Sequence, residues 1–75
     1  MRQIYDEPTV MWRMRRAEMS SHATITAHRG GAVVVWFLNG HRLGSRDFTD
    51  WTGALRWSEQ LQFQNWVVGW RPATE

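Results

Sequence analysis

Residues 22–43 read HATITAHRGGAVVVWFLNGHRL, and this stretch decides the fold. Two turn signals divide it, Gly30-Gly31 and Asn39-Gly40, and both are typical of two-residue turns between antiparallel strands. The segments beside the turns are rich in Val, Thr and aromatic residues, which strands favour. The stretch therefore predicts two β-hairpins in succession.

The two turns can be checked against each other, because a two-residue turn fixes the register of the strands that it joins. The first turn places Ile25 opposite Trp36, and the second places Trp36 opposite Leu43. Both registers bring the same apolar side chains to one face, which we expect to carry the core. These side chains are Ala23, Ile25, Ala27, Val34, Trp36, Leu38 and Leu43.

The opposite face of the hairpins is polar on one strand and apolar on the next. It carries His22, Thr24, Thr26, His28, Val33, Val35, Phe37 and Arg42. Antiparallel sheets often leave one face to solvent, which is the simplest interpretation. The alternation of Val33, Val35 and Phe37 favours a covered face instead, because it makes an apolar strip. The cover can come from Ile4 and Tyr5, from a second protomer or from a ligand.

A further strand is predicted before the hairpins, at residues 9–16, where the sequence TVMWRMRR alternates. A turn is expected over residues 18–21. One side of this strand holds Val10, Trp12 and Met14, and the other holds Met11, Arg13 and Arg15.

A helix is predicted after the hairpins. Thr49 and Asp50 are both suitable N-cap residues, and an apolar stripe with helical spacing follows them. The stripe consists of Trp51, Ala54, Leu55, Ser58 and Leu61. We expect the helix to end near Gln64, with Asn65 as the residue after the C-cap. Residues 66–70 are too apolar for a free tail and are expected to pack as a short extended segment.

These elements predict one α+β domain over residues 9–70, with an antiparallel sheet of three or four strands followed by one helix that packs on the core face. Residues 1–8 are expected to form a flexible lead-in, and residues 71–75 a tail. The chain of 75 residues has room for a single domain, and it has no Cys to form disulfides. Its six Trp residues must supply much of the core or contact a partner.

The charge pattern is unusual because all nine basic residues are Arg, while the net charge is only +2. Codon bias in a GC-rich genome is the simpler explanation, and we favour it over a functional need. The functional interpretation is that Arg makes bidentate contacts with phosphate and stacks on rings. Neither a secretory signal nor a membrane-spanning segment is evident, which predicts a cytoplasmic protein without a membrane partner.

The first candidate site is the face of the sheet opposite the predicted core, because it combines Arg with an aromatic side chain. Such a combination suits contacts with a phosphate backbone and stacking on a base. The candidate nucleic-acid-binding residues are Arg13, Arg15, His28, Phe37 and Arg42.

A protein interface is the second candidate site. The apolar strip supplies three of its residues, and an aromatic residue opposite the helix stripe supplies a fourth, since surface aromatics often anchor partners. The candidate interface residues are Val33, Val35, Phe37 and Phe63. Trp57 and Trp66 flank the helix stripe and are expected to belong to the core.

No catalytic, metal or cofactor site is predicted, and no small-molecule substrate is evident. Ser45, Asp47 and Asp50 lie close to His41 in sequence, but this spacing implies none of the geometry that a catalytic triad needs. His22 and His28 are six residues apart on one strand, about 20 Å, which is too far for a shared metal ion.

Two resemblances to known protein families rest on these residues. The chain resembles a loose group of small uncharacterised bacterial proteins that have a β-meander followed by one helix ending in Gly-Trp. The resemblance rests on Trp12-Arg13, Gly30-Gly31, residues 36–40, Phe48, Ala54-Leu55, Trp57 and Gly69-Trp70. This resemblance covers about residues 10–70 and implies no activity.

A second resemblance rests on Leu43-Gly44-Ser45, Phe48 and Ala54-Leu55, which are similar to the strand-to-helix passage of AP2-type DNA-binding domains. Those domains, like the arm-binding domains of tyrosine integrases, place a three-stranded sheet in the major groove. The resemblance implies DNA contacts by Arg13, Arg15 and Arg42. The sequence departs from it at Thr24, Thr26, Val33 and Val35, because neither of these two strands offers an Arg or Lys on this face.

Taken together, the sequence predicts a non-enzymatic binding module that acts through a surface, with a protein partner or a homodimer as the first hypothesis. DNA binding through the Arg-lined sheet face is the alternative.

Overall fold

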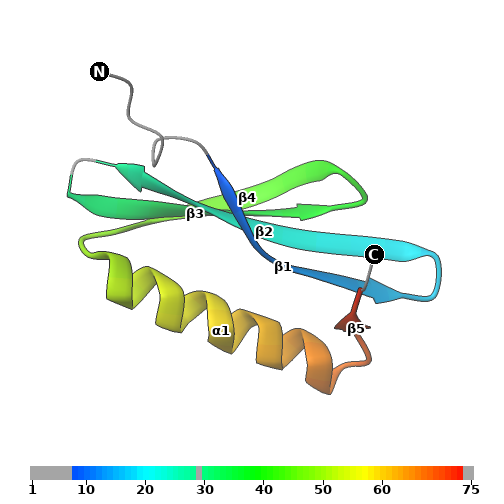
Figure 1. Ribbon diagram of the computed structural model, residues 1–75. Coiled ribbons are helices and arrows are strands. Elements are labelled where there is room, and N and C mark those ends of the chain that lie inside the picture. The colour runs from blue at the N-terminus through cyan, green and yellow to red at the C-terminus, as the bar shows by residue number, and fades with distance from the viewer. Residues whose placement is uncertain (1–7, 29, 74–75) are drawn as a thin grey trace.

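The computed structural model describes residues 8–28 and 30–73. Its elements are β1 (Thr9–Arg16), β2 (Met19–His28), β3 (Gly31–Leu38), β4 (His41–Phe48), α1 (Trp51–Val67) and β5 (Arg71–Pro72). The strands form one antiparallel sheet in the order β4-β3-β2-β1-β5, and α1 covers one of its faces (Figure 1).

The α+β class and the helix after the hairpins are confirmed, but the sheet has five strands rather than three or four. Residues 71–72, expected to lie in a tail, pair with β1 instead, and the amide of Ala73 donates to the carbonyl oxygen of Arg13 at 2.9 Å. Our expectation for residues 1–7 lies outside the described residues. No helix in the described part of the chain is long and apolar enough to cross a membrane.

The second hairpin forms as predicted. Asn39 and Gly40 have φ angles of 52° and 83°, as a type I′ turn requires, and Leu38 pairs with His41. The side chain of Asn39 also accepts a hydrogen bond from the amide of Ser20 at 2.9 Å, which ties the turn to β2.

The first hairpin turns one residue earlier than predicted, because His28 pairs with Gly31. Ile25 therefore lies opposite Val34 rather than Trp36, a register change of two residues. Because side chains alternate with a period of two, this change leaves every side chain on its predicted face. Gly31 is needed for close packing: a Cβ atom there would collide with the carbonyl oxygen of Phe48.

Two bulges move apolar side chains away from their expected positions. In β4, Phe37 pairs with Arg42 and Trp36 with Gly44, so Leu43 is the extra residue and is 61% exposed. The predicted core position of Leu43 is wrong, because the indole of Trp36 lies against Gly44, where a Cβ atom would be 2.8 Å from the ring. In β1, the register shifts between Val10 and Trp12. Val10 therefore does not share the face of Trp12, and it is 41% exposed.

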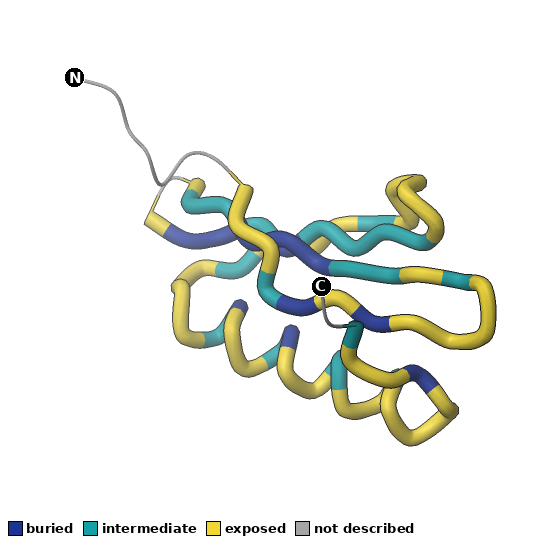
Figure 2. The backbone as a smooth tube through the Cα atoms, turned by 45° about the vertical axis from the view of Figure 1, so that its right-hand side comes forward, coloured by how far each residue is buried: buried dark blue, intermediate teal, exposed yellow. Residues whose placement is uncertain are grey.

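The core between the sheet and α1 consists of two clusters. The first contains Trp12, Met14, Ala23 and Trp70, and the second contains Ile25, Ala32, Val34 and Ala54. Trp36 packs against both clusters. The indole Nε1 of Trp12 donates to the carbonyl oxygen of Ser58 at 3.2 Å, which fixes the helix over β1. Figure 2 shows these buried positions in the middle of the sheet and on the turns of α1 that face it.

The helix begins as predicted and ends later. Asp50 is the N-cap, and its carboxylate accepts from the amide of Gly53 at 2.6 Å. The last helical residue is Val67 rather than Gln64, and Gly69 follows the cap with a φ angle of 108°. The helix meets the sheet through Ala54 and Ser58, and Leu61 is half-buried, whereas the first and third members of the predicted stripe are exposed.

Three tryptophans on α1 or just after it differ in burial. Trp57 is half-buried against the second cluster, as expected. Trp66 is 47% exposed, which contradicts its predicted core position, because the longer helix carries it to the outer side. Trp70 takes the buried position instead, and its amide donates to the carbonyl oxygen of Asn65 at 3.0 Å.

Candidate functional site

The face of the sheet that α1 leaves uncovered, here called the open face, carries four side chains in one line across four strands. Arg13 pairs with His22, His22 with Phe37, and Phe37 with Arg42. We call these four residues the cross-strand row. Three strand spacings separate its ends, which is about 14 Å. The row therefore places a guanidinium group at each end of an aromatic pair.

The aromatic pair at the centre of the row is closely stacked. The ring centroids of His22 and Phe37 are 4.4 Å apart, and the angle between their planes is 8°. Burial lowers the pKa of His22, and the positive charge of Arg13 lowers it further. The lowered pKa favours the uncharged form of the imidazole at neutral pH.

Three arginines surround this stack. Arg13 and Arg42 end the row, and the Nη2 of Arg42 donates to Ser45 Oγ at 2.9 Å. Arg15 lies two residues beyond Arg13 on the same face and pairs with Ser20. All three arginines are exposed, so positive charge gathers at this end of the open face. Asp47 lies toward the other end, opposite Val33.

The structure brings together four of the five predicted nucleic-acid-binding residues: Arg13, Arg15, Phe37 and Arg42. It does not bring His28 to them, because His28 pairs with Gly31 at the far end of β2. His22, which was not among the predicted binding residues, lies beside Phe37. The predicted register placed His22 on the correct face but opposite another residue. Placing the first turn one residue earlier would have brought His22 opposite Phe37.

The predicted interface residues form two surfaces rather than one. Val33, Val35 and Phe37 follow one another on the open face and are half-buried. Phe63 is 63% exposed, as we expected, but it lies on α1, on the other side of the sheet.

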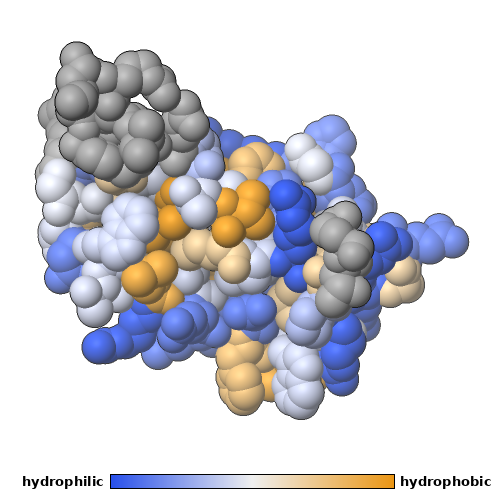
Figure 3. Space-filling model, viewed as in Figure 1, coloured by the Kyte–Doolittle hydropathy of each residue, from blue (hydrophilic) through white to orange (hydrophobic). Residues whose placement is uncertain are grey.

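Phe63 belongs to an apolar surface at the end of α1, which we call the helix-end patch. The patch consists of Phe63, Trp66, Val67 and Val68, which are 63%, 47%, 61% and 55% exposed. The rings of its two aromatic residues stack with centroids 6.4 Å apart, and the guanidinium of Arg71 lies 4.6 Å from the centre of the Trp66 ring. Figure 3 shows hydrophobic surface at the lower margin of the molecule, where α1 lies in Figure 1.

The residues that we weighed as a catalytic group have structural contacts. Asp50 caps α1, and Ser45 accepts from Arg42. Among residues 8–28 and 30–73, no group of three or more potential ligands is arranged to hold a metal ion.

Comparisons with known proteins return no match among family models, curated proteins or solved structures. The functional interpretation therefore rests on the chemistry of the chain's own residues.

Proposed function

We propose that this protein is a non-enzymatic binding module whose open face binds single-stranded nucleic acid. The observation that carries the proposal is the cross-strand row, in which Arg13 and Arg42 flank the stacked rings of His22 and Phe37. Proteins that bind single strands combine basic side chains that follow the backbone with aromatic side chains on which bases stack. The row supplies both within one line of side chains.

A single strand fits this face better than a duplex does. The row is about 14 Å long, which exceeds the roughly 12 Å width of the major groove of B-DNA. The middle of the face also offers Val33 and Val35, which have no donors or acceptors for base edges. Direct readout of a duplex requires such groups, whereas stacking and backbone contacts do not.

The test is a titration of a fluorescein-labelled, mixed-sequence 12-nucleotide DNA strand, followed by fluorescence anisotropy at several salt concentrations. For single strands, each lost phosphate contact lowers the slope of log K against log salt by about 0.7. We expect R13A/R42A to lower the slope by about 1.4. We expect Phe37→Ala to weaken binding by about 5- to 150-fold, because one stacking contact is lost.

Arg56→Ala is the matched control, because Arg56 is exposed on α1, away from the open face. It should leave the affinity and the salt slope unchanged. Equal losses in Arg56→Ala and Arg13→Ala would show that binding depends only on total charge, and the proposal would then be wrong. A duplex of the same sequence should bind more weakly than the single strand.

The second candidate function is association with a protein, and the helix-end patch favours a second copy of this chain. Four neighbouring side chains that are about half exposed or more make a larger apolar surface than isolated surface residues do. Sedimentation velocity of the wild type and of Phe63→Asp tests this candidate. A dimer that Phe63→Asp converts to a monomer supports it, and a wild type that is monomeric at all concentrations excludes it.

A further inference from the structure

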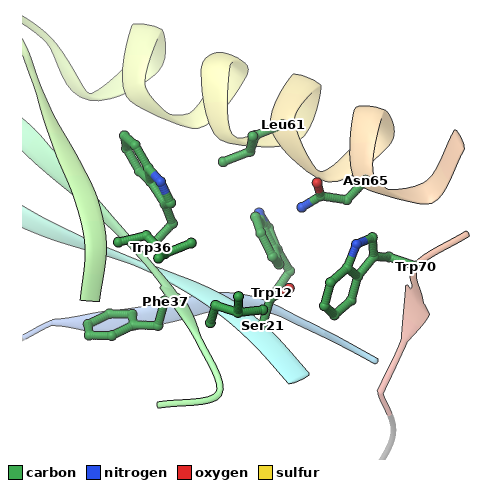
Figure 4. Close-up of a pocket in the computed structure, with 9 residues that line it drawn as sticks. Trp12, Ser21, Trp36, Phe37, Leu61, Asn65 and Trp70 are labelled. Carbon is green, nitrogen blue, oxygen red and sulfur yellow. The ribbon is translucent and has the colours of Figure 1, made fainter. Parts of the chain in front are cut away.

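A cavity of about 310 Å³ lies between the sheet and the second half of α1, on the side opposite the open face (Figure 4). The indoles of Trp12, Trp36 and Trp70 form much of its wall, and Leu38, Leu43 and Leu61 contribute the remaining aliphatic surface. Its lining contains no charged side chain. The ring of Phe37, whose residue also borders the cavity, points away from it in Figure 4.

The bulge in β4 accounts for this space. Without the bulge, Leu43 would lie opposite Trp36 on the core face. With the bulge, Leu43 is 61% exposed at the rim of the cavity, and Gly44, which has no side chain, lies beside Trp36 instead. The helix approaches the sheet closely through Ala54 and Ser58, so the gap opens only beyond them.

Two polar groups belong to the wall. Ser21 Oγ is buried and has no hydrogen-bond partner among the described residues. A buried hydroxyl without a partner is costly to a folded protein, and a rotation about one bond turns it toward a ligand in the cavity. The carboxamide of Asn65 points from α1 toward Trp12 across the same space (Figure 4).

We propose that this cavity binds a small, neutral aromatic molecule with one hydroxyl or amide group. The volume lies at the lower end of the range for small-molecule sites. It equals the space of about ten water molecules, which is the size of a fused two-ring compound. The indole walls favour a flat ring, the uncharged lining favours a neutral ligand, and Ser21 supplies a hydrogen bond. This site lies on the other side of the sheet from the one that we propose for nucleic acid, and the two share only Phe37.

The probe is 2-naphthol, and naphthalene serves as the comparison that lacks a hydroxyl group. The six Trp residues provide the readout, because each gives one indole signal in a ¹H–¹⁵N spectrum of labelled protein. We expect 2-naphthol to shift the signals of Trp12, Trp36 and Trp70, with a Kd on the order of 0.1–1 mM. The signals of Trp51 and Trp66, which lie outside the cavity, should not move.

Ser21→Ala tests the polar contact. It removes an unpartnered hydroxyl and should leave the fold intact. We expect it to weaken 2-naphthol binding by about five- to tenfold and to leave naphthalene binding unchanged. An unchanged ratio of the two affinities would overturn the role of Ser21.

Phe63→Ala is the control for adsorption to the helix-end patch, and it should have no effect. No shift at millimolar 2-naphthol, or equal shifts at Trp66 and Trp36, would overturn the cavity proposal. The test substitutes no residue of the cross-strand row, so its outcome is distinguishable from that of the nucleic-acid titration.

Discussion

The imidazole of His22 lies flat against the phenyl ring of Phe37, with centroids 4.4 Å apart. The two residues are directly opposite each other on β2 and β3, so the backbone register creates the contact. Arg13, the opposite neighbour of His22, lowers the pKa of the imidazole in addition to the effect of burial. Both burial and the nearby positive charge therefore oppose protonation of His22.

Stability should depend on pH through His22. Its pKa in the folded protein lies below the ordinary value of 6.5, so the unfolded chain takes up the proton more readily. The free energy of unfolding should fall as pH drops from 6.5 through the folded pKa, and it should be constant above that window. Thermal unfolding between pH 4 and 8 measures this, with His22→Gln as a variant that lacks the dependence.

An NMR titration of the histidine ring signals gives the direct readout. Arg13→Gln should raise the pKa of His22 toward 6.5, because it removes the neighbouring positive charge. Burial should still hold the pKa below that value. A titration of His22 above pH 6.5 in the wild type would contradict this account.

Gly31 should tolerate a methyl group less well than Gly30 does. Gly31→Ala places a Cβ atom against the carbonyl oxygen of Phe48, a backbone atom that moves only with β4, so we expect a loss of about 2–3 kcal/mol. Gly30→Ala meets no neighbouring atom and costs only the strain of a φ angle of 83°, about 1 kcal/mol. Urea denaturation compares the two variants, and equal losses would show that the close approach to Phe48 is unimportant.

Asp50 rather than Thr49 should stabilise the start of α1. Asp50→Ala removes the acceptor for the amide of Gly53 and should cost about 1 kcal/mol. Thr49→Ala should change the free energy of unfolding by less than about 0.5 kcal/mol, as surface substitutions usually do. The reverse order in chemical denaturation would assign the cap to Thr49.

Trp12 should be the tryptophan whose hydrogen bond matters most for packing. Trp12→Phe keeps an aromatic ring but removes the donor to Ser58 in the core, and we expect a loss of about 1–3 kcal/mol. Trp51→Phe is the matched control, because Trp51 is 41% exposed. Its effect should stay below about 0.5 kcal/mol. A similar loss in both variants would remove the special role of the Trp12 contact.

The face of the sheet on which each side chain lies is predictable from the sequence, because side chains alternate between the two faces along a strand. The error in the first turn shifted the register by two residues and therefore left Ile25 and Val34 in the core. Bulges break this rule. A glycine inside a strand, such as Gly44, permits a bulge, but it does not show which neighbouring residue becomes the extra one. Leu43 left the core because the Trp36 ring lies over Gly44, a contact between strands that the order of residues does not show.

The sequence predicted the face that carries the candidate site, but only some of the residues that form it. The residue types on the open face follow from alternation, so Arg13, Phe37 and Arg42 were expected there. Which side chains are neighbours depends on register, and the shift of two residues is why His22 rather than Thr24 lies opposite Phe37. The separation of Phe63 from the apolar strip follows from the helix packing on the other face, which places the two on opposite sides of the sheet.

The pairing of β5 with β1 has a consequence for the order of folding. The strands β1 to β4 join by successive hairpins, whose short loops close on a microsecond timescale. The contact of Met14 with Pro72, in contrast, closes nearly the whole chain into a loop. Trp70, just before β5, completes the cluster that contains Trp12. The hairpins can therefore form before the ends meet, and the cluster around Trp12 is completed only when residues 70–72 dock on β1.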